Sequence, residues 1–284
     1  MKKLDYPTHL NLELTNHCQL DCACCPNRVI KRERGFLSWE VLGKIVEESR
    51  GKTKTCHPHG LGEPLLHPEL FEMLSYIKNA GIKVWLATNA MLLTEDVSDK
   101  LFDIGVDEII LPLWSMKKDT YERLRENVSF DVVMENINTC IQLRSLRKDA
   151  ETRILLHVVP TDETYNEFED IKKTYLPLLE DFGTVERKGY STFAKSVPRL
   201  YAGLKVPFNG RCMLPNWNVT TYWNGDVVLC CHDVDGFSKV GNVMETSMKE
   251  IWDSPLYEEY RRSIRERDFS CNPFCGRCLK EDNE

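Results

Sequence analysis

Two periods of apolar residues divide the first two thirds of the chain into alternating elements. Short apolar runs typical of buried strands are separated by longer segments in which apolar residues recur every three or four positions, as in amphipathic helices. We expect strands at residues 9–15, 53–58, 82–88, 107–113, 153–159 and 183–189, and helices at 38–50, 68–79, 94–104, 118–126, 131–147 and 163–179. This alternation predicts a parallel α/β architecture with right-handed crossovers.

The pattern changes after Gly189. Residues 190–211 are irregular, and residues 218–229 indicate a hairpin that turns at Asn224-Gly225, a pair favoured in tight turns. One helix is expected at 247–265, and the tail after it is dense in cysteine. We therefore predict two domains, at residues 1–189 and 190–284.

Composition narrows the class of protein. The 284 residues are 42% hydrophobic and 29% charged, an ordinary globular balance, and the net charge of −7 argues against a broad surface for nucleic acid. No apolar run reaches the ~20 residues of a membrane span, and none follows Met1 as in a signal peptide. We expect a cytoplasmic chain whose 12 cysteines stay reduced and serve as metal ligands or catalytic groups.

A cysteine triplet follows the first predicted strand. Cys18, Cys22 and Cys25 have the spacing C-x3-C-x2-C, and no fourth ligand completes the set nearby. Three thiolates can hold a cubane iron–sulfur cluster while one iron keeps an open position for a small molecule. A structural zinc site would instead be closed by four ligands.

This spacing resembles the signature of the radical S-adenosylmethionine (SAM) superfamily. In that family the unligated iron chelates SAM, and one electron cleaves SAM to methionine and a 5′-deoxyadenosyl radical that takes hydrogen from a C–H bond. The family core is a partial (β/α)6 barrel, which agrees with the six predicted strand–helix units. The resemblance implies a [4Fe–4S] cluster on the triplet, bound SAM, and an electron donor such as flavodoxin or ferredoxin.

A glycine-rich run, Gly60-Leu61-Gly62-Glu63-Pro64, follows the second predicted strand. It resembles the family's Gly-Gly-Glu motif, which binds the SAM amino group, although Leu61 departs from the usual glycine spacing. The resemblance implies SAM contacts from Gly62, Glu63 and Pro64. By itself, such a tripeptide is equally typical of an ordinary turn.

Polar residues also follow the next two strands. Thr88 and Asn89 end the third predicted strand, and Ser115 follows the fourth. The family often places polar contacts to SAM at these positions. The alternative is that these strand-end side chains only satisfy local backbone groups.

The tail is similar to the twitch module, a shortened SPASM domain. Cys212 is followed by twelve residues, Gly225, four more residues and Cys230, and a C-x2-C pair follows at Cys275 and Cys278. The resemblance implies that these four cysteines bind a second [4Fe–4S] cluster, with a hairpin end meeting a C-x2-C loop. Zinc suits a C-x2-C pair equally well.

Other cysteines have no place in these two sets. Cys271 precedes the pair and also completes a C-x3-C-x2-C spacing, but no β/α barrel follows it, so we reject a second SAM site there. Cys271 either replaces a ligand or stays free. Cys231 is either a packing residue or a thiol that returns hydrogen to a substrate radical. Cys140 lies in an apolar helical stripe and is expected in the core, whereas Cys56 either joins the core or lines the cavity.

The chain most resembles the twitch-bearing aminocyclitol dehydrogenases of aminoglycoside biosynthesis. The likeness rests on His59 before the Gly-Glu-Pro run, Cys212-Met213-x-Pro215, the step to Cys230 and the final C-x2-C pair. It implies hydrogen abstraction from a hydroxyl- or amine-bearing carbon of a polar small molecule. Dehydrogenation to a ketone follows if a base removes the hydroxyl proton and the second cluster takes an electron, and epimerisation follows if a thiol returns hydrogen to the opposite face.

Four residues are candidate bases or substrate contacts: His59, His157, Arg187 and His232. His157 is equally typical of a buried histidine with its hydrogen bonds satisfied. Peptide modification is the alternative within radical SAM enzymes, because SPASM modules often serve it. Such enzymes commonly carry an N-terminal peptide-recognition domain, and we expect none ahead of Cys18. A non-catalytic zinc or iron–sulfur protein would bind metal without cleaving SAM. Membrane and nucleic-acid partners are not expected.

Overall fold

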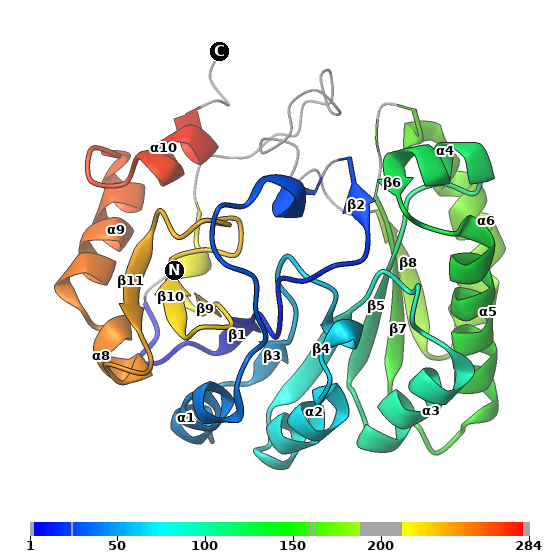
Figure 1. Ribbon diagram of the computed structural model, residues 1–284, viewed down its shortest axis with the longest axis horizontal. Helices are drawn as coiled ribbons and strands as arrows, with labels where there is room; N and C mark the ends of the chain where they lie inside the picture. Colours follow the sequence, from blue (N-terminus) through cyan, green and yellow to red (C-terminus); the bar gives the residue numbers. More distant parts are fainter. Residues whose placement is uncertain (1–2, 24, 160, 162, 188–211, 281–284) are drawn as a thin grey trace.

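A parallel sheet forms the centre of the molecule. The computed structural model describes residues 3–23, 25–159, 161, 163–187 and 212–280, with backbone alone for 277–280. Within these residues, nine strands form one sheet in the order β11-β10-β9-β1-β3-β4-β5-β7-β8 (Figure 1). The parallel strands of the first domain are β1 (His9–Leu12), β3 (Thr55–His57), β4 (Lys83–Ala87), β5 (Glu108–Leu113), β7 (Arg153–Val158) and β8 (Gly183–Arg187). The predicted parallel α/β architecture is confirmed.

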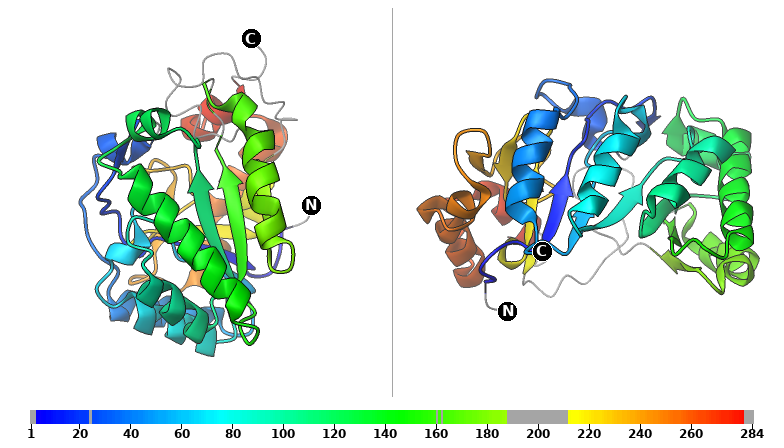
Figure 2. Two further views of the ribbon diagram at one scale, coloured as in Figure 1. Left: turned by 90° about the vertical axis from the view of Figure 1, so that its right-hand side faces the viewer. Right: turned by 90° about the horizontal axis from the view of Figure 1, so that it is seen from below.

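Helices follow these strands along one side of the sheet (Figures 1 and 2). The side chains of Ser38, Thr94 and Ser129 each accept a backbone N–H of the first helical turn, which explains where three of the helices begin. The helices are α1 (Trp39–Ser49), α2 (Leu70–Asn79), α3 (Glu95–Ile104), α4 (Lys118–Leu124), α5 (Phe130–Leu146) and α6 (Phe168–Leu179).

The two faces of the sheet differ in polarity. In β1, Leu10 and Leu12 are buried against the helices, while His9 and Asn11 are half-buried on the opposite face. Strand β4 repeats this alternation, whereas in β5 and β7 the apolar residues Ile110 and Leu155 on the opposite face are buried as well. The register places residues of one face side by side across the strands. We call the side away from the helices the inner face. The apolar outer face and the helices make the core, which includes Cys56 and Cys140.

The tail extends the same sheet. Strand β9 (Asn218–Thr221) pairs in parallel with β1, and β10 (Asp226–Val228) and β11 (Lys239–Asn242) continue it antiparallel. The expected turn at Asn224-Gly225 is confirmed, with Gly225 at a φ of 86° that favours glycine. Strand β11 was not predicted. The proposed domain boundary at residue 189 lies outside the described residues and stays a prediction.

Two helical predictions in the tail were wrong. The expected helix at 247–265 is two helices, α8 (Met248–Trp252) and α9 (Pro255–Glu266), because Ser254 caps a new helix and Pro255 supplies no N–H. The expected C-x2-C loop is helix α10 (Pro273–Lys280). The Asn272 side chain accepts the Cys275 N–H at 3.2 Å and so caps α10.

No helix in the described part of the chain combines the length and apolarity needed to cross a membrane.

Candidate cluster and substrate site

The predicted cysteine triplet lies in one anchored loop. Cys18, Cys22 and Cys25 are half-buried in the segment that follows β1. Within it, β2 (Asp21–Cys22) pairs antiparallel with β6 (Arg125–Glu126), so that Cys22 lies opposite Arg125. We had expected a helix through residue 126, but α4 ends at Leu124. The early end of α4 lets the chain pair with the cysteine loop.

Arg125 places a buried positive charge beside this loop. Its side chain is 3% exposed and hydrogen-bonds the Cys22 thiol and the Tyr121 hydroxyl. A guanidinium next to a sulfur favours the thiolate form that metal binding requires. The sequence pattern missed Arg125, because an arginine at a helix end is indistinguishable from a surface residue until its burial is known.

Glu63 connects the glycine-rich run to the end of β4. Its carboxylate is 2% exposed and accepts hydrogen bonds from the Thr88 hydroxyl and the Asn89 N–H, both at 2.7 Å, and from the Leu65 N–H at 3.1 Å. Burial raises the pKa of Glu63, and these donors oppose that effect. The structure therefore brings Glu63, Thr88 and Asn89 together, with the carboxylate directed at the protein itself.

Gly62 and Asn89 place this run against the cysteine loop. A Cβ atom on Gly62 would lie 2.2 Å from the Thr15 carbonyl oxygen, so only glycine permits this approach. The Glu63 N–H donates to the His17 carbonyl at 2.8 Å, and the Asn89 amide lies 3.8 Å from the Cys18 sulfur. Pro64 is buried and begins the 3-10 turn η2 (Pro64–Leu66). The two motifs identified separately in the sequence are thus neighbours in space.

Ser115 uses its hydroxyl within the protein. The side chain is fully buried and donates to Glu167 at 2.8 Å, and the Met116 N–H donates to the same carboxylate at 2.9 Å. Glu167 belongs to the 3-10 turn η3 (Tyr165–Glu167) before α6. A contact between Ser115 and SAM stays a prediction.

Arg187 lies on the outer side of β8. Its guanidinium carbon is 4.7 Å from the ring centre of Tyr165 and 4.4 Å from that of Phe168. In the alternation of β8, Arg187 shares a face with the buried Val185, whereas Glu186 belongs to the inner face. The expectation that Arg187 contacts substrate has no support from this placement. A position near a strand end does not tell which face a side chain takes.

The tail cysteines come from three segments that are distant in sequence. Cys212 precedes the 3-10 turn η5 (Leu214–Asn216), Cys230 follows β10, and Cys275 is 7% exposed in α10. Cys212 and Cys230 both interact electrostatically with Cys231, which places the three together, and burial raises the pKa of Cys212. The ligand atoms of Cys230, Cys231 and His232 lie within 4.8 Å of one another.

Neutral N–H groups face the sulfurs of the tail. The His232 backbone N–H donates to the Cys230 sulfur at 3.5 Å, and the Asn272 amide donates to the Cys275 sulfur at 3.3 Å. Donors of this kind stabilise cluster thiolates, so these residues fit an iron–sulfur cluster. Cys271 is half-buried close to Tyr260. Helix α10 includes Cys278, whose side chain lies outside the described part, as does all of Cys24.

Several polar side chains line the inner face of the sheet, below the cysteine loop and the glycine-rich run. The Asn11 amide donates to the Asn218 side chain at 2.8 Å and to the Thr220 hydroxyl at 3.3 Å, so the tail contributes to this face. The centre of the His57 ring lies 4.9 Å from the ring centre of Trp85 and 5.6 Å from that of His59, the candidate base. Burial lowers the pKa of His57 to about 4, so its imidazole is neutral near pH 7. Apart from His59, the sequence motifs did not identify these inner-face residues, although the alternation of side chains along each strand could have shown that they share a face.

Two family models match the chain. The radical SAM superfamily model matches residues 12–174, which is 163 of the 284 residues, and a SPASM iron–sulfur cluster-binding domain model matches residues 212–279. The chain belongs to the radical SAM superfamily. Its cofactors are accordingly SAM and a [4Fe–4S] cluster, with a further iron–sulfur cluster in the SPASM region. The cysteine loop and the tail cysteines are chemically suited to these two clusters.

Among individual proteins, the chain is similar to the tungsten-containing aldehyde ferredoxin oxidoreductase cofactor-modifying protein of Pyrococcus furiosus. That match is 24% identical and covers 96% of this chain and 88% of the relative. Among solved structures, BtrN in complex with AdoMet and 2-DOIA is 18% identical with a TM-score of 0.64, covering 100% of this chain and 95% of that one. Streptococcus suis SuiB bound to precursor peptide SuiA is 15% identical with a TM-score of 0.63, covering 91% and 67%. These structures show the fold alone.

Proposed function

We propose that this radical SAM enzyme abstracts hydrogen from a hydroxyl- or amine-bearing carbon of a polar small molecule of the aminocyclitol, aminoglycoside or sugar type. The observation that carries the proposal is the polarity of the inner face, where His9, Asn11, His57 and Thr220 come from three neighbouring strands. Hydroxyl- and amine-rich substrates need several such hydrogen-bonding partners when they leave water.

Residues around the inner face have separate roles in this proposal. Cys18, Cys22 and Cys25 hold the cluster that supplies the electron for SAM cleavage, and Glu63 fixes the ends of β3 and β4 around bound SAM. His57 is held neutral, so its imidazole can accept or donate a hydrogen bond to a substrate hydroxyl. His59 lies beside it and is the candidate base.

Two fates of the substrate radical remain in the proposal. Cys212, Cys230, Cys275 and Cys278 are the proposed ligands of the second cluster, which would accept an electron in dehydrogenation. Cys231 is exposed beside Cys230 and would return a hydrogen atom in epimerisation, and one electron from the external donor with one proton would then restore its thiol. His232 lies in the same group and is a candidate proton carrier for either fate.

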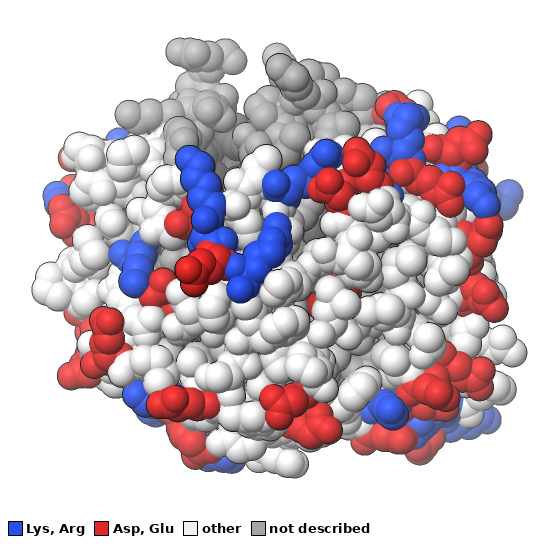
Figure 3. Space-filling view, in the orientation of Figure 1, with Lys and Arg blue, Asp and Glu red and all other residues white. Residues whose placement is uncertain are grey.

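A peptide substrate is the second candidate. SuiB is bound to its precursor peptide and shares the fold, so a peptide could occupy the inner face in this enzyme too. The net charge of −7 does not favour nucleic acid, and on the face shown in Figure 3 the Lys and Arg side chains of the upper part lie among acidic side chains, with more acidic side chains along the lower part.

The test is turnover with candidate substrates in two separate labelling experiments. Reconstituted, reduced enzyme is incubated with SAM and a panel of aminocyclitols and aminoglycosides, and with peptides as the comparison set. With C-deuterated substrates in ordinary water, we expect 5′-deoxyadenosine that carries deuterium from an aminocyclitol or sugar. With unlabelled substrates in deuterated water, solvent deuterium at the product carbon indicates epimerisation, and a two-electron-oxidised product without it indicates dehydrogenation. Transfer of deuterium to 5′-deoxyadenosine from peptides, and from none of the small molecules, would overturn the proposal.

A further inference from the structure

A short strap links the two cluster-binding regions. We define the strap as residues 31–35, which follow the cysteine loop and lead the chain back beside β1. The strap ends where Thr15 and Phe36 form an antiparallel bridge and the Leu37 N–H donates to the Leu14 carbonyl at 2.7 Å. It therefore closes the loop that carries Cys18, Cys22 and Cys25 at its base.

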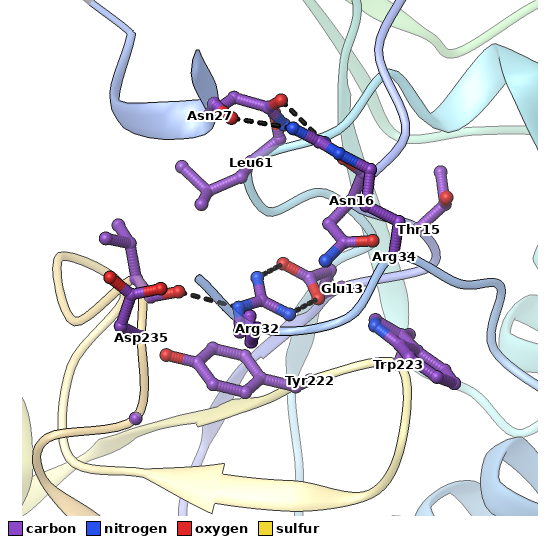
Figure 4. A network of polar contacts seen from close by, with 12 residues as sticks. Glu13, Thr15, Asn16, Asn27, Arg32, Arg34, Leu61, Tyr222, Trp223 and Asp235 are labelled. Carbon is purple, nitrogen blue, oxygen red and sulfur yellow. Dashed lines mark hydrogen bonds and ion pairs between the residues drawn. The ribbon is translucent and has the colours of Figure 1, made fainter. Parts of the chain in front are cut away.

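One side of the strap binds the cysteine loop (Figure 4). Arg34 donates to the side chain and the backbone carbonyl of Asn27, both at 2.7 Å, and also to the Asn16 carbonyl. The Asn16 amide donates in return to the Glu33 carbonyl at 2.8 Å. The Asn27 amide donates to the Leu61 carbonyl at 2.8 Å, which ties the loop to the glycine-rich run.

The other side of the strap binds the tail. The Lys31 N–H donates to Asp235 at 2.7 Å, and the Trp223 ring N–H donates to the Glu33 carbonyl at 3.3 Å. A Cβ atom on Gly35 would lie 2.6 Å from the Trp223 ring, so the two segments are in close contact. The strap is thus held between two regions that are about 200 residues apart in sequence.

Arg32 is the centre of this junction. Its guanidinium forms two parallel bonds with the Glu13 carboxylate, one of them at 2.6 Å, and its carbon lies 3.9 Å from the Tyr222 ring centre (Figure 4). Its third nitrogen donates to the Val234 carbonyl at 2.6 Å. The side chains of Arg32 and Glu13 are 14% and 2% exposed. A planar fork that both pairs and stacks is a use of arginine that lysine cannot reproduce.

The tail segment that Arg32 contacts leads directly to a predicted cluster ligand. Val234 lies four residues after Cys230. Between them, the Asp233 carboxylate accepts the N–H groups of Gly236 and Phe237 at 3.0 Å, and the Tyr222 hydroxyl donates to the Asp233 carbonyl. The Asp233 N–H also donates to the Cys230 carbonyl at 3.0 Å, so the segment from Cys230 to Phe237 is one hydrogen-bonded turn that links the position of Val234 to that of the cysteine.

We propose that Arg32 is a positioning residue that holds the segment carrying Cys230 in a fixed place relative to the cysteine loop, and so sets the geometry between the two clusters. Buried ion pairs contribute little net stability after desolvation, and their best-supported use is to select one arrangement of packed parts. The inference rests on the two cluster sites and not on the identity of the substrate, so failure of the proposed reaction would leave it standing.

The test compares Arg32→Lys with Arg123→Lys. Arg123 forms the same bidentate fork with Glu163, but on the exposed surface and away from the strap, so it is the matched control. In reconstituted protein we expect Arg32→Lys to keep about eight irons, and amide hydrogen exchange to become about tenfold faster or more in peptides from both 16–35 and 229–238. The control variant should match wild type in iron content and in the exchange rates of these peptides. Faster exchange in only one of the two segments, or in neither, would overturn the proposal.

A second variant covers the case in which Arg32→Lys does not fold because the lysine ammonium fails to reach the buried Glu13 carboxylate. Glu13→Gln combined with Arg32→Met removes both charges and keeps the packing on Tyr222, while the bond to Val234 is lost. We expect this double variant to fold and bind both clusters, with coupled loosening of the two segments and an altered EPR line shape of the reduced second cluster. An EPR signal and exchange pattern identical to wild type would refute the positioning role.

Discussion

The cysteine loop and the cysteine-rich tail are both suited to an iron–sulfur cluster, but they differ in the spacing of their cysteines and in the groups that face the sulfurs. The three cysteines of the loop lie within eight residues, and one neighbouring sulfur faces the buried guanidinium of Arg125. The tail cysteines are spread over residues 212–278, and the sulfurs of Cys230 and Cys275 face neutral N–H donors from His232 and Asn272. Charge near the sulfurs tunes a cluster's potential, so the two sites are expected to differ in redox behaviour.

The difference also teaches how each site depends on the rest of the fold. The loop is short enough to bring its ligands together by itself, but it is held in place by the ends of β3 and β4 and by β6. The predicted tail ligands lie before η5, after β10 and in α10, so we expect that site to form only when these elements are assembled. Substitution of a ligand cysteine in one region should therefore remove the cluster of that region and leave the other cluster in place.

The largest expected effect comes from removing a ligand of the loop. In Cys22→Ala we expect iron to fall from about eight to about four per chain and 5′-deoxyadenosine to fall to background, because the electron source for SAM cleavage is lost. Iron analysis and chromatography of the reduced reaction measure both. Formation of 5′-deoxyadenosine by this variant would contradict the assignment of the loop.

Removal of a tail ligand should give the opposite pattern of losses. In Cys230→Ala we expect iron to fall to about four while reductive SAM cleavage continues, because the first cluster is intact. Cys231→Ala is the matched control and should keep about eight irons. If Cys231→Ala instead loses the second cluster and Cys230→Ala keeps it, the two neighbours exchange roles. If Cys231→Ala keeps both clusters but loses product, it is the hydrogen donor.

A smaller effect is expected where the glycine-rich run meets the loop. Gly62→Ala would force a Cβ atom against the Thr15 carbonyl, and overpacking of this kind costs about 1–3 kcal/mol. We expect a lower unfolding temperature and weaker SAM binding by calorimetry. Gly43→Ala, in α1 with no atom within 4 Å of the added Cβ, is the control and should be neutral or stabilising. If the two variants have the same unfolding temperature and the same SAM affinity, the close approach at Gly62 does not contribute to SAM binding.

The smallest effect concerns pH and the inner face. The pKa of His57 is about 4 in the folded protein, below its ordinary value of 6.5, so unfolding takes up a proton between these values. Stability from His57 is complete above pH 6.5 and is lost as pH falls toward 4, by at most about 3 kcal/mol. Denaturant unfolding at pH 7 and pH 4.5 should show a smaller loss for His57→Gln than for wild type. An equal loss in both would mean that His57 is not held neutral.

Local patterns were enough for most of the first domain. Strands and helices appear close to their expected positions because alternation, the caps Ser38 and Thr94 and the stop at Gly105 act within a few residues. The cysteine spacing and the Gly62-Glu63 pair are local in the same sense. At Ser254-Pro255 and Asn272-Pro273 the capping residues decided the outcome, whereas the apolar pattern predicted one helix across the first pair and the C-x2-C resemblance implied a loop after the second.

The sequence by itself determined the order of elements, the radical SAM signature and the cysteine set, because each depends on residues near one another in the chain. Only the tertiary structure decided that the tail joins the barrel sheet through β9, that Arg125 faces Cys22 and that Arg187 turns outward. It also decided that Arg32 pairs with Glu13 and stacks on Tyr222. These features depend on burial and on pairing between distant segments, which no local pattern encodes.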